Sequence, residues 1–216
     1  KQDFKVLKTK DLYPFPDNPF HVAEDETLSE LAESIKEFGI VTPIITRPKE
    51  DGDGYEVIAG QRRVRASELA GINTIPAFVL SLDRDRAIIT LVDSNLQREN
   101  ILPSERAFAY KMKSEAMKRQ GFRTDLTSSQ VVTKLRTDDK VAQGFGVGRM
   151  TVQRFIRLTE LIPPILQMVD EGKIALTPAV ELSFLKKDEQ ENLFATMESE
   201  EATPSLSQAQ DRKSVV

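Results

Sequence analysis

The sequence contains no cysteine and no tryptophan, and His21 is its single histidine. The absence of cysteine excludes disulfide bonds, thiolate metal sites and a cysteine nucleophile. A single histidine argues against a histidine-based metal site or catalytic triad. No apolar run approaches the roughly 20 residues that a membrane-spanning helix needs, and no signal peptide pattern opens the chain. We therefore expect a cytoplasmic protein with no membrane partner.

The composition is typical of a soluble globular chain of one or two domains, with 216 residues, 39% hydrophobic and 30% charged. Its net charge of -4 is spread unevenly. Residues 84–157 carry seven more basic than acidic side chains, whereas residues 1–83 and 158–216 carry excesses of five and six acidic ones. A basic middle between acidic ends is typical of a segment that binds a polyanion.

The stretch from Gly54 to Gly71, GYEVIAGQRRVRASELAG, changes from a strand pattern to a helix pattern at a glycine. Alternating residues precede Gly60, and helix-forming residues follow it. Arg62 and Arg63 fall in the first turn of that helix, where free N–H groups and the positive end of the helix dipole favour an anion. This arrangement suits phosphate. The alternative is that these arginines lie on an ordinary solvated helix surface.

The rest of the first 83 residues indicates mixed helix and strand. The proline-dense segment 13–19 predicts an extended loop, because proline is excluded from helix interiors and central strands. A predicted helix has Thr27 near its N-cap and Gly39 at its end, with apolar residues at spacings of three and four. Strands are expected over residues 5–8, 40–47, 55–59 and 74–80, with 40–47 paired to 55–59.

Two motifs resemble those of the ParB/Spo0J partition proteins. The stretch GQRRVRASELAG is similar to the family motif G-E-R-R-x-R-A, with Gln61 in place of the usual Glu. The stretch DSNLQRE ends a helix expected from Arg84 and resembles the motif E-N-x-Q-R-E, with Ser94 where the family has Glu. An Asn-Pro loop, a helix of the form L-x-x-L-x-x-S-I-x-x-x-G and the segment T-P-I-I-x-R-P occur in the family's order as well.

The resemblance implies a ParB/sulfiredoxin-like domain that binds CTP with Mg²⁺, with Asn95 as the metal ligand. The nucleotide-binding residues that it implies are Gly60, Gln61, Arg62, Arg63, Asn95, Arg98 and Glu99. Because Ser94 removes one hard-oxygen ligand, we expect CTP binding with slow turnover, at most a weak CTPase activity. The alternative is that Asn95 and Arg98 only cap and solvate the end of a helix.

The chain is predicted to be helical from Pro103, where a basic helix extends to Gln120. The elements expected next are a short helix over 128–135, a stretch over 141–145 that continues it or starts another helix, a glycine turn at 146–148 and a helix over 149–161. Together they indicate a helix-turn-helix. In that motif the start of the second helix contacts the major groove of DNA. The predicted DNA-binding residues are Arg149, Met150, Thr151, Gln153, Arg154 and Arg157. An ordinary helical hairpin is the alternative, and residues 137–140 look like an insertion relative to the family.

Further short helices are expected after Pro163. The predicted domains are a nucleotide-binding domain over 1–100, a helical DNA-binding domain over 101–197 and a linker or disordered tail over 198–216. The predicted fold class is therefore an α+β domain followed by an all-α helix-turn-helix domain.

These features predict a DNA-binding partition protein of the ParB type. The resemblance implies a homodimer that binds a centromere-like palindrome in double-stranded DNA, a clamp that CTP closes, a ParA-type ATPase as partner and a place on the nucleoid. Two other functions stay open. One is a transcriptional regulator with the ParB fold and no nucleotide switching, which CTP binding would exclude. The other is an enzyme like the free-serine kinases, for which a helix-turn-helix has no use.

Overall fold

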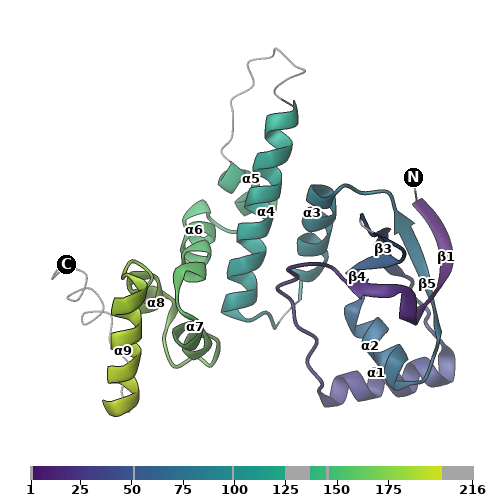
Figure 1. The fold of residues 1–216 in the computed structure, drawn as a ribbon, viewed down its shortest axis with the longest axis horizontal. Helices are drawn as coiled ribbons and strands as arrows, with labels where there is room; N and C mark the ends of the chain where they lie inside the picture. The colour runs from purple at the N-terminus through teal and green to yellow at the C-terminus, as the bar shows by residue number, and fades with distance from the viewer. Residues whose placement is uncertain (1, 51, 99, 125–136, 145, 201–216) are drawn as a thin grey trace. The chain divides into compact units, whose positions relative to one another are not determined.

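The computed structural model describes residues 2–50, 52–98, 100–124, 137–144 and 146–200. The chain divides into two compact units, Lys1–Gln97 and Arg98–Val216 (Figure 1). The first unit combines a sheet with helices, and the described part of the second is helical, which confirms the predicted fold class. No helix among the described residues has both the length and the apolar character needed to cross a membrane.

A five-stranded mixed sheet forms the centre of the first unit, with the strand order β1-β5-β3-β4-β2. Its strands are β1 Gln2–Lys8, β2 Leu12–Pro14, β3 Ile44–Pro48, β4 Tyr55–Ala59 and β5 Thr74–Leu80. The pairs β1/β5 and β3/β4 are antiparallel, whereas β2/β4 and β3/β5 are parallel. The predicted pairing of β3 with β4 is thereby confirmed.

Two predictions for the strands were wrong in part. Leu12–Pro14 reaches into the segment predicted as a loop, yet it forms β2. Proline is tolerated there because β2 is the edge strand, so the missing N–H need not face a neighbouring strand. The strand predicted over 40–47 begins only at Ile44. Pro43, which has no N–H to donate, directly precedes it.

Three helices accompany the sheet: α1 Glu26–Phe38, α2 Gln61–Leu69 and α3 Arg84–Asn95, with a 3-10 turn, η1 Thr9–Asp11, between β1 and β2. Figure 1 shows α1 and α2 on one side of the sheet and α3 on the other. Val64 of α2 packs against the buried sheet residues Leu7, Ile44, Val57, Ile75, Ala77 and Val79. The apolar face of α3 consists of the buried residues Ala87, Ile88, Leu91 and Val92.

The N-cap of α1 is Asp25 rather than Thr27. Its carboxylate accepts a hydrogen bond from the Leu28 N–H at 2.9 Å, which satisfies one of the free donors of the first turn. Thr27 instead donates its hydroxyl to Asp25 at 2.8 Å. Gly39 ends the helix, as the sequence predicts.

A buried ion pair joins β3 to β4. Arg47 and Glu56 are opposite each other in the register, and the Arg47 Nε donates to Glu56 Oε2 at 2.7 Å. Arg47 also donates to Glu50, and its guanidinium lies 5.2 Å from the centre of the Phe15 ring. Burial opposes the charge on Arg47, but the hydrogen bonds to Glu50 and Glu56 outweigh it and raise the pKa. Arg47 therefore connects β3 with β4 through Glu56 and with the segment after β2 through Phe15.

The second unit consists of α4 Pro103–Thr124, α5 Thr137–Gly144, α6 Arg149–Arg157, η2 Leu158–Glu160, α7 Pro163–Asp170, α8 Leu176–Leu182 and α9 Lys187–Glu200. The helix predicted over 128–135 lies outside the described residues, as does the predicted tail beyond Glu200. Residues 137–140, which looked like an insertion, form the first turn of α5.

The long helix α4 packs against α6. The Tyr110 ring meets the Phe155 ring edge to face, with 5.9 Å between their centres, and the Arg106 guanidinium lies 5.4 Å from the centre of the Phe155 ring. Asp170 of α7 accepts from the Ser104 N–H at 2.8 Å and from its hydroxyl. The first turn of α4 is therefore capped by a residue of another helix.

Candidate functional site

The turn from β4 into α2 requires glycine at position 60. Gly60 has a φ of 103°, a conformation that other residues rarely adopt. A Cβ atom there would lie 2.7 Å from the Ile44 Cγ2 atom and 3.2 Å from a guanidinium nitrogen of Arg63. Gly60 thus lets α2 begin directly after β4, with the free N–H groups of its first turn at this bend.

Arg62, in the first turn of α2, is held by the N-cap of α1. Its guanidinium donates to Asp25 Oδ1 at 3.2 Å and also to the Thr27 hydroxyl. Hydrogen bonds from Arg62, Thr27 and the Leu28 N–H lower the pKa of Asp25 to about 2. A cation at a helix N-terminus opposes the helix dipole and needs a negative partner. Asp25 is that partner.

Arg63 extends the other way, toward the loop before β3. Its guanidinium donates to the carbonyl of Thr42 and, at 2.8 Å, to the carbonyl of Pro43. Burial lowers the pKa of Arg63, although an arginine stays charged at neutral pH. Gln61 donates its amide to the carbonyls of Val57 and Ile58 at 3.3 and 3.2 Å. Gln61 therefore fastens the turn and cannot serve as a general base.

A second ion pair links α2 to the segment before α1. Arg65 donates to Glu24, and at 3.1 Å to Glu68 one turn further along α2. Together with Arg62–Asp25, it joins two acidic residues that are adjacent in sequence to one face of α2. Arg65 therefore joins α2 to the segment before α1, whereas Arg62 and Arg63 lie in the first turn of α2.

These groups suit an anion with several negative charges. The side chain of Arg62 is 27% exposed, so solvent still reaches its guanidinium. Free N–H groups, the helix dipole and two arginines all favour a phosphate at the start of α2. The space that a side chain at position 60 would need is already occupied by Ile44.

The predicted metal site is less complete. Asn95 is buried, and its amide nitrogen donates to the Leu91 carbonyl at 2.8 Å, so only its Oδ1 could reach a cation. Ser94 donates to the same carbonyl at 2.9 Å. Within the described ranges, no group of three or more His, Cys, Asp or Glu residues could hold a metal ion. Arg98 is partly exposed at the start of the second unit, and Glu99 lies outside the described residues.

The turn between α5 and α6 is built on Gly146, with a φ of 63°. The Val147 N–H donates to the Ala142 carbonyl at 3.1 Å, and the Gly146 N–H donates to the Gln143 carbonyl at 3.3 Å. These two bonds form a Schellman motif, which ends a helix and redirects the chain. Gly148 then acts as the N-cap of α6. The glycine turn of the predicted helix-turn-helix is confirmed.

The start of α6 carries side chains that reach solvent. Val152 and Phe155 are buried, whereas Met150 is 68% exposed. The other predicted DNA-binding residues are partly exposed: Arg149, Thr151, Gln153, Arg154 and Arg157. Arg154 donates to the hydroxyl of Thr177 in α8. The first turn contains no acidic residue that would repel a polyanion.

The partners of Arg157 hold its side chain inside the helical unit. Its guanidinium donates to the Ser183 hydroxyl at 3.1 Å and to the Ser183 carbonyl at 2.6 Å. It also lies 4.1 Å from the centre of the Phe184 ring. Arg157 thereby holds the end of α8 against α6. The expectation that Arg154 or Arg157 contacts backbone phosphate stays a prediction.

Sequence reasoning missed the partners of the arginines. Asp25 and Glu24 lie 37 and 41 residues before Arg62 and Arg65, so no local pattern joins them. A signal existed for the capping role of Asp25, which stands three residues before the first buried leucine of α1.

The two units together define a class of chains that join an α+β domain to a helix-turn-helix domain. Residues 1–96 match the family model of the ParB N-terminal domain, and residues 127–206 match that of the ParB HTH domain. The chain belongs to the ParB family.

Two relatives illustrate the extent of the similarity. The chain is 37% identical over 192 residues to the "Probable chromosome 1-partitioning protein ParB" of Deinococcus radiodurans, covering 88% of this chain and 59% of the relative. It is 35% identical over 184 residues to the "Chromosome-partitioning protein Spo0J" of Thermus thermophilus, covering 85% and 61%. The chain thus spans about three fifths of the length of these relatives.

Solved structures support the fold. A C-terminally truncated chromosome-partitioning protein ParB from Caulobacter crescentus, complexed to the centromeric parS site, is similar with a TM-score of 0.55 and 23% identity, covering 98% of this chain and 100% of that one. A Pnob8-like ParB-N domain is similar with a TM-score of 0.58 and 15% identity, covering 89% of each.

Proposed function

We propose that this chain is the DNA-binding and nucleotide-binding part of a ParB-type chromosome-partition protein. The observation that carries the proposal is a helix-turn-helix with a solvent-facing α6, in a chain whose first 96 residues match the ParB N-terminal domain. Relatives are named as chromosome-partitioning proteins, and the Caulobacter protein is described in complex with the centromeric parS site. This chain would bind a centromere-like palindrome in double-stranded DNA as a homodimer.

In this proposal α6 enters the major groove. Arg149 and Gln153 contact base edges, because their planar donor groups match the acceptors of guanine and adenine. Met150 and Thr151 approach the groove beside them. Arg154 contacts backbone phosphate and so sets the position of the helix. Arg157 supports α6 from behind through Ser183.

The start of α2 would bind the phosphates of CTP. Gly60 lets α2 begin at the end of β4, so that the free N–H groups of its first turn face the phosphates, and Arg62 and Arg63 neutralise their charge. Asn95 would hold Mg²⁺ with the help of the nucleotide, and the metal would screen phosphate charge. The family motif assigns Arg98 and Glu99 to the nucleotide as well. Ser94 and Gln61 replace two carboxylates of the family motifs, and neither a hydroxyl group nor an amide is an effective general base for water. Slow turnover of CTP follows.

Nucleotide binding would then regulate DNA binding. CTP would close a clamp of two copies around DNA, and a ParA-type ATPase would move the complex on the nucleoid. These roles rest on the family resemblance.

A second candidate is a transcriptional regulator with the same fold and no nucleotide switch. The observation in its favour is that Arg62 and Arg63 already have partners within the chain, Asp25 and the carbonyls of Thr42 and Pro43. A free-serine-kinase-like enzyme has less support, since residues 127–206 match a helix-turn-helix domain.

One experiment separates these functions. CTP, ATP and GTP are titrated into the protein with Mg²⁺, with and without parS-like DNA, and binding is measured by calorimetry. Of the three nucleotides, we expect only CTP to bind. We expect Arg63→Ala to weaken CTP binding at least about tenfold, a loss of about 1.4 kcal/mol. Arg65→Ala is the control, because Arg65 pairs with Glu24 and Glu68. Equal binding of all three nucleotides, or of none, would remove the nucleotide proposal and leave the regulator.

A further inference from the structure

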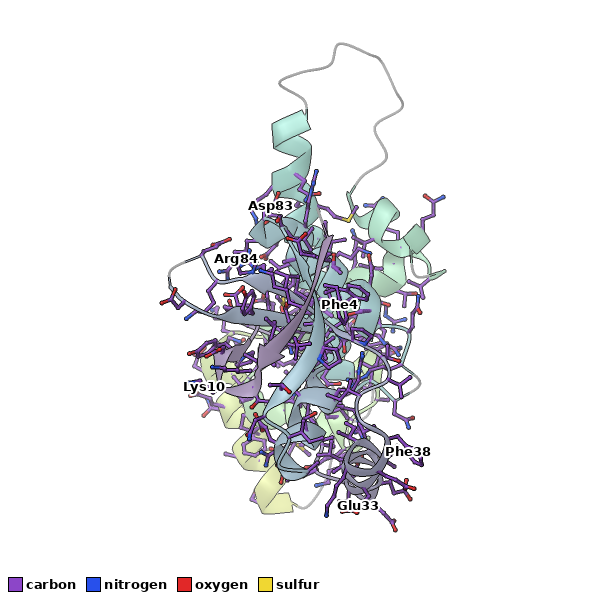
Figure 2. All side chains as sticks on the ribbon, turned by 90° about the vertical axis from the view of Figure 1, so that its right-hand side faces the viewer. Phe4, Lys10, Glu33, Phe38, Asp83 and Arg84 are labelled. Carbon is purple, nitrogen blue, oxygen red and sulfur yellow. The ribbon has the colours of Figure 1, made fainter. Side chains whose placement is uncertain are left out.

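The strand β1 forms an open edge of the sheet. It pairs with β5 on one side, and among the described residues no strand lies on its other side. Asp3, Phe4, Lys5 and Val6 are all exposed in succession, so both faces of this edge reach solvent. Figure 2 views the molecule from this side, with Phe4 on the strand nearest the viewer. Backbone N–H and C=O groups along such an edge can pair with another strand.

One face of β1 is apolar. Phe4 and Val6 are 60% and 63% exposed, and both point to the same face because side chains alternate along a strand. Phe78 of β5, opposite Phe4 in the register, touches it edge to face with 5.7 Å between the ring centres. The edge therefore offers an aromatic pair and a valine to a partner. Exposed apolar strands of this kind are association sites.

The other face of β1 carries Asp3 and Lys5, whose opposite charges can pair between two copies of the strand. If two copies of β1 pair antiparallel with Phe4 opposite Phe4, Asp3 of each copy stands opposite Lys5 of the other. A shift by one step of the register in either direction places Lys5 opposite Lys5 or Asp3 opposite Asp3. Opposite charges across a strand pair stabilise it, and like charges destabilise it. Only the first register joins aromatic contact with two ion pairs.

We propose that β1 binds β1 of a second copy of this chain in that register, so that two sheets join at their edges. The occupant is a second copy because the charge pattern and the aromatic pair both match under a two-fold axis through Phe4. The contact uses neither α2 nor α6, and it does not depend on nucleotide or DNA.

Cross-linking tests the register directly. The natural sequence has no cysteine, so in Phe4→Cys a disulfide can form only between copies. Facing residues of an antiparallel pair are close enough for a disulfide. We expect the full chain, without nucleotide or DNA, to form a disulfide dimer at least about tenfold faster than Phe38→Cys, where the replaced side chain is also well exposed, at 69%. Equal rates for the two variants would overturn the proposal.

Charge reversal tests it without a covalent bond. Sedimentation velocity over a range of concentrations gives the dimer dissociation constant. We expect Lys5→Asp to weaken the dimer about tenfold, because two ion pairs become two repulsions. Adding Asp3→Lys exchanges the charges and should restore the dimer to within about threefold. All four residues of this edge are exposed, so the variants should fold. A chain that stays monomeric at every concentration, or an exchange that fails to restore the dimer, contradicts self-pairing.

Discussion

Single residues decide the charge balance at the start of α2. Asp25 serves as N-cap for α1 and as counter-ion for Arg62. One carboxylate thus connects the beginnings of two helices that are far apart in sequence. An incoming phosphate would compete with this carboxylate for Arg62. In the proposed function, Arg62 would therefore exchange one anionic partner, Asp25, for another, the phosphate.

The ionisation of Asp25 reports this arrangement. We expect an NMR titration of its carboxyl group to give a pKa of about 2, against an ordinary value of 3.8. Because the folded pKa is the lower one, the stabilisation from the pair is complete above about pH 3.8 and is lost as the pH falls through about 2. In Arg62→Ala the pKa should rise toward its ordinary value. Arg65→Ala should leave it unchanged, and a rise there as large as in Arg62→Ala would contradict the assignment.

Ser94 decides how fast CTP is turned over in the proposed function. We expect Ser94→Glu to raise the rate of phosphate release from CTP while binding is kept, because a carboxylate is a stronger Mg²⁺ ligand than a hydroxyl group. Phosphate release under saturating CTP measures the effect. Ser94→Gln is the control, because glutamine has nearly the size of glutamate and carries no charge. Equal rates for both variants would show that the missing carboxylate is not the limiting group.

Among the elements, α2 depends on the glycine before it. We expect Gly60→Ala to destabilise the protein by about 1–3 kcal/mol, because alanine at positive φ is strained and its Cβ would strike Ile44. Urea unfolding measures this. Gly52→Ala is the matched control, since a Cβ there meets no atom within 4 Å. If both variants unfolded at the same urea concentration, the packing argument for Gly60 would fail.

In the proposed function, one side of helix α6 contacts DNA, and the other side, with Val152 and Phe155, is buried. We expect Arg149→Ala to weaken binding by about 1–3 kcal/mol on the specific DNA site and by little on random DNA.

Arg157→Ala should instead destabilise the helical unit by about 1–2 kcal/mol, because the Ser183 bonds and the Phe184 contact are lost. The salt dependence of DNA binding should stay unchanged.

Binding at several salt concentrations and urea unfolding measure the two effects. If the DNA affinity of Arg157→Ala depended less on salt than that of the unaltered chain, Arg157 would be assigned a contact with backbone phosphate. Equal losses on specific and random DNA in Arg149→Ala would remove its role in reading bases.

Elements with strong local patterns were predictable from the sequence, and elements that depend on distant partners were not. The strand Thr74–Leu80 was predicted with its correct bounds. The apolar face of α3 was predicted because the spacing of apolar residues is a local signal. The strand β2 was missed because only its pairing with β4 makes it a strand. The Gly60 turn was visible in the sequence, but the contact of Arg157 with Ser183, across 26 residues, was not.

At the scale of the whole molecule, the chain has two compact units with separate candidate sites. In the proposed function each ligand should stabilise the unit that binds it. At a concentration 100 times its Kd, a ligand adds about 2.7 kcal/mol to the stability of its unit.

Hydrogen exchange followed by mass spectrometry can locate this effect. We expect CTP to slow exchange in α2 and the β4–α2 turn, and parS-like DNA to slow it in α5 and α6. ATP is the control for CTP, and DNA of random sequence is the control for parS-like DNA. Protection by CTP confined to the helical unit would contradict the assignment of the nucleotide to the Gly60 turn.

The cap of α4 also bears on the order in which the chain is made. Ser104 receives its capping partner only from Asp170, 66 residues later. On the ribosome, Ser104 therefore stays without this partner until Asp170 has left the exit tunnel. The sheet of the first unit has no such delay, because its last strand ends at Leu80. The first unit can thus finish folding while the helical unit is still being synthesised.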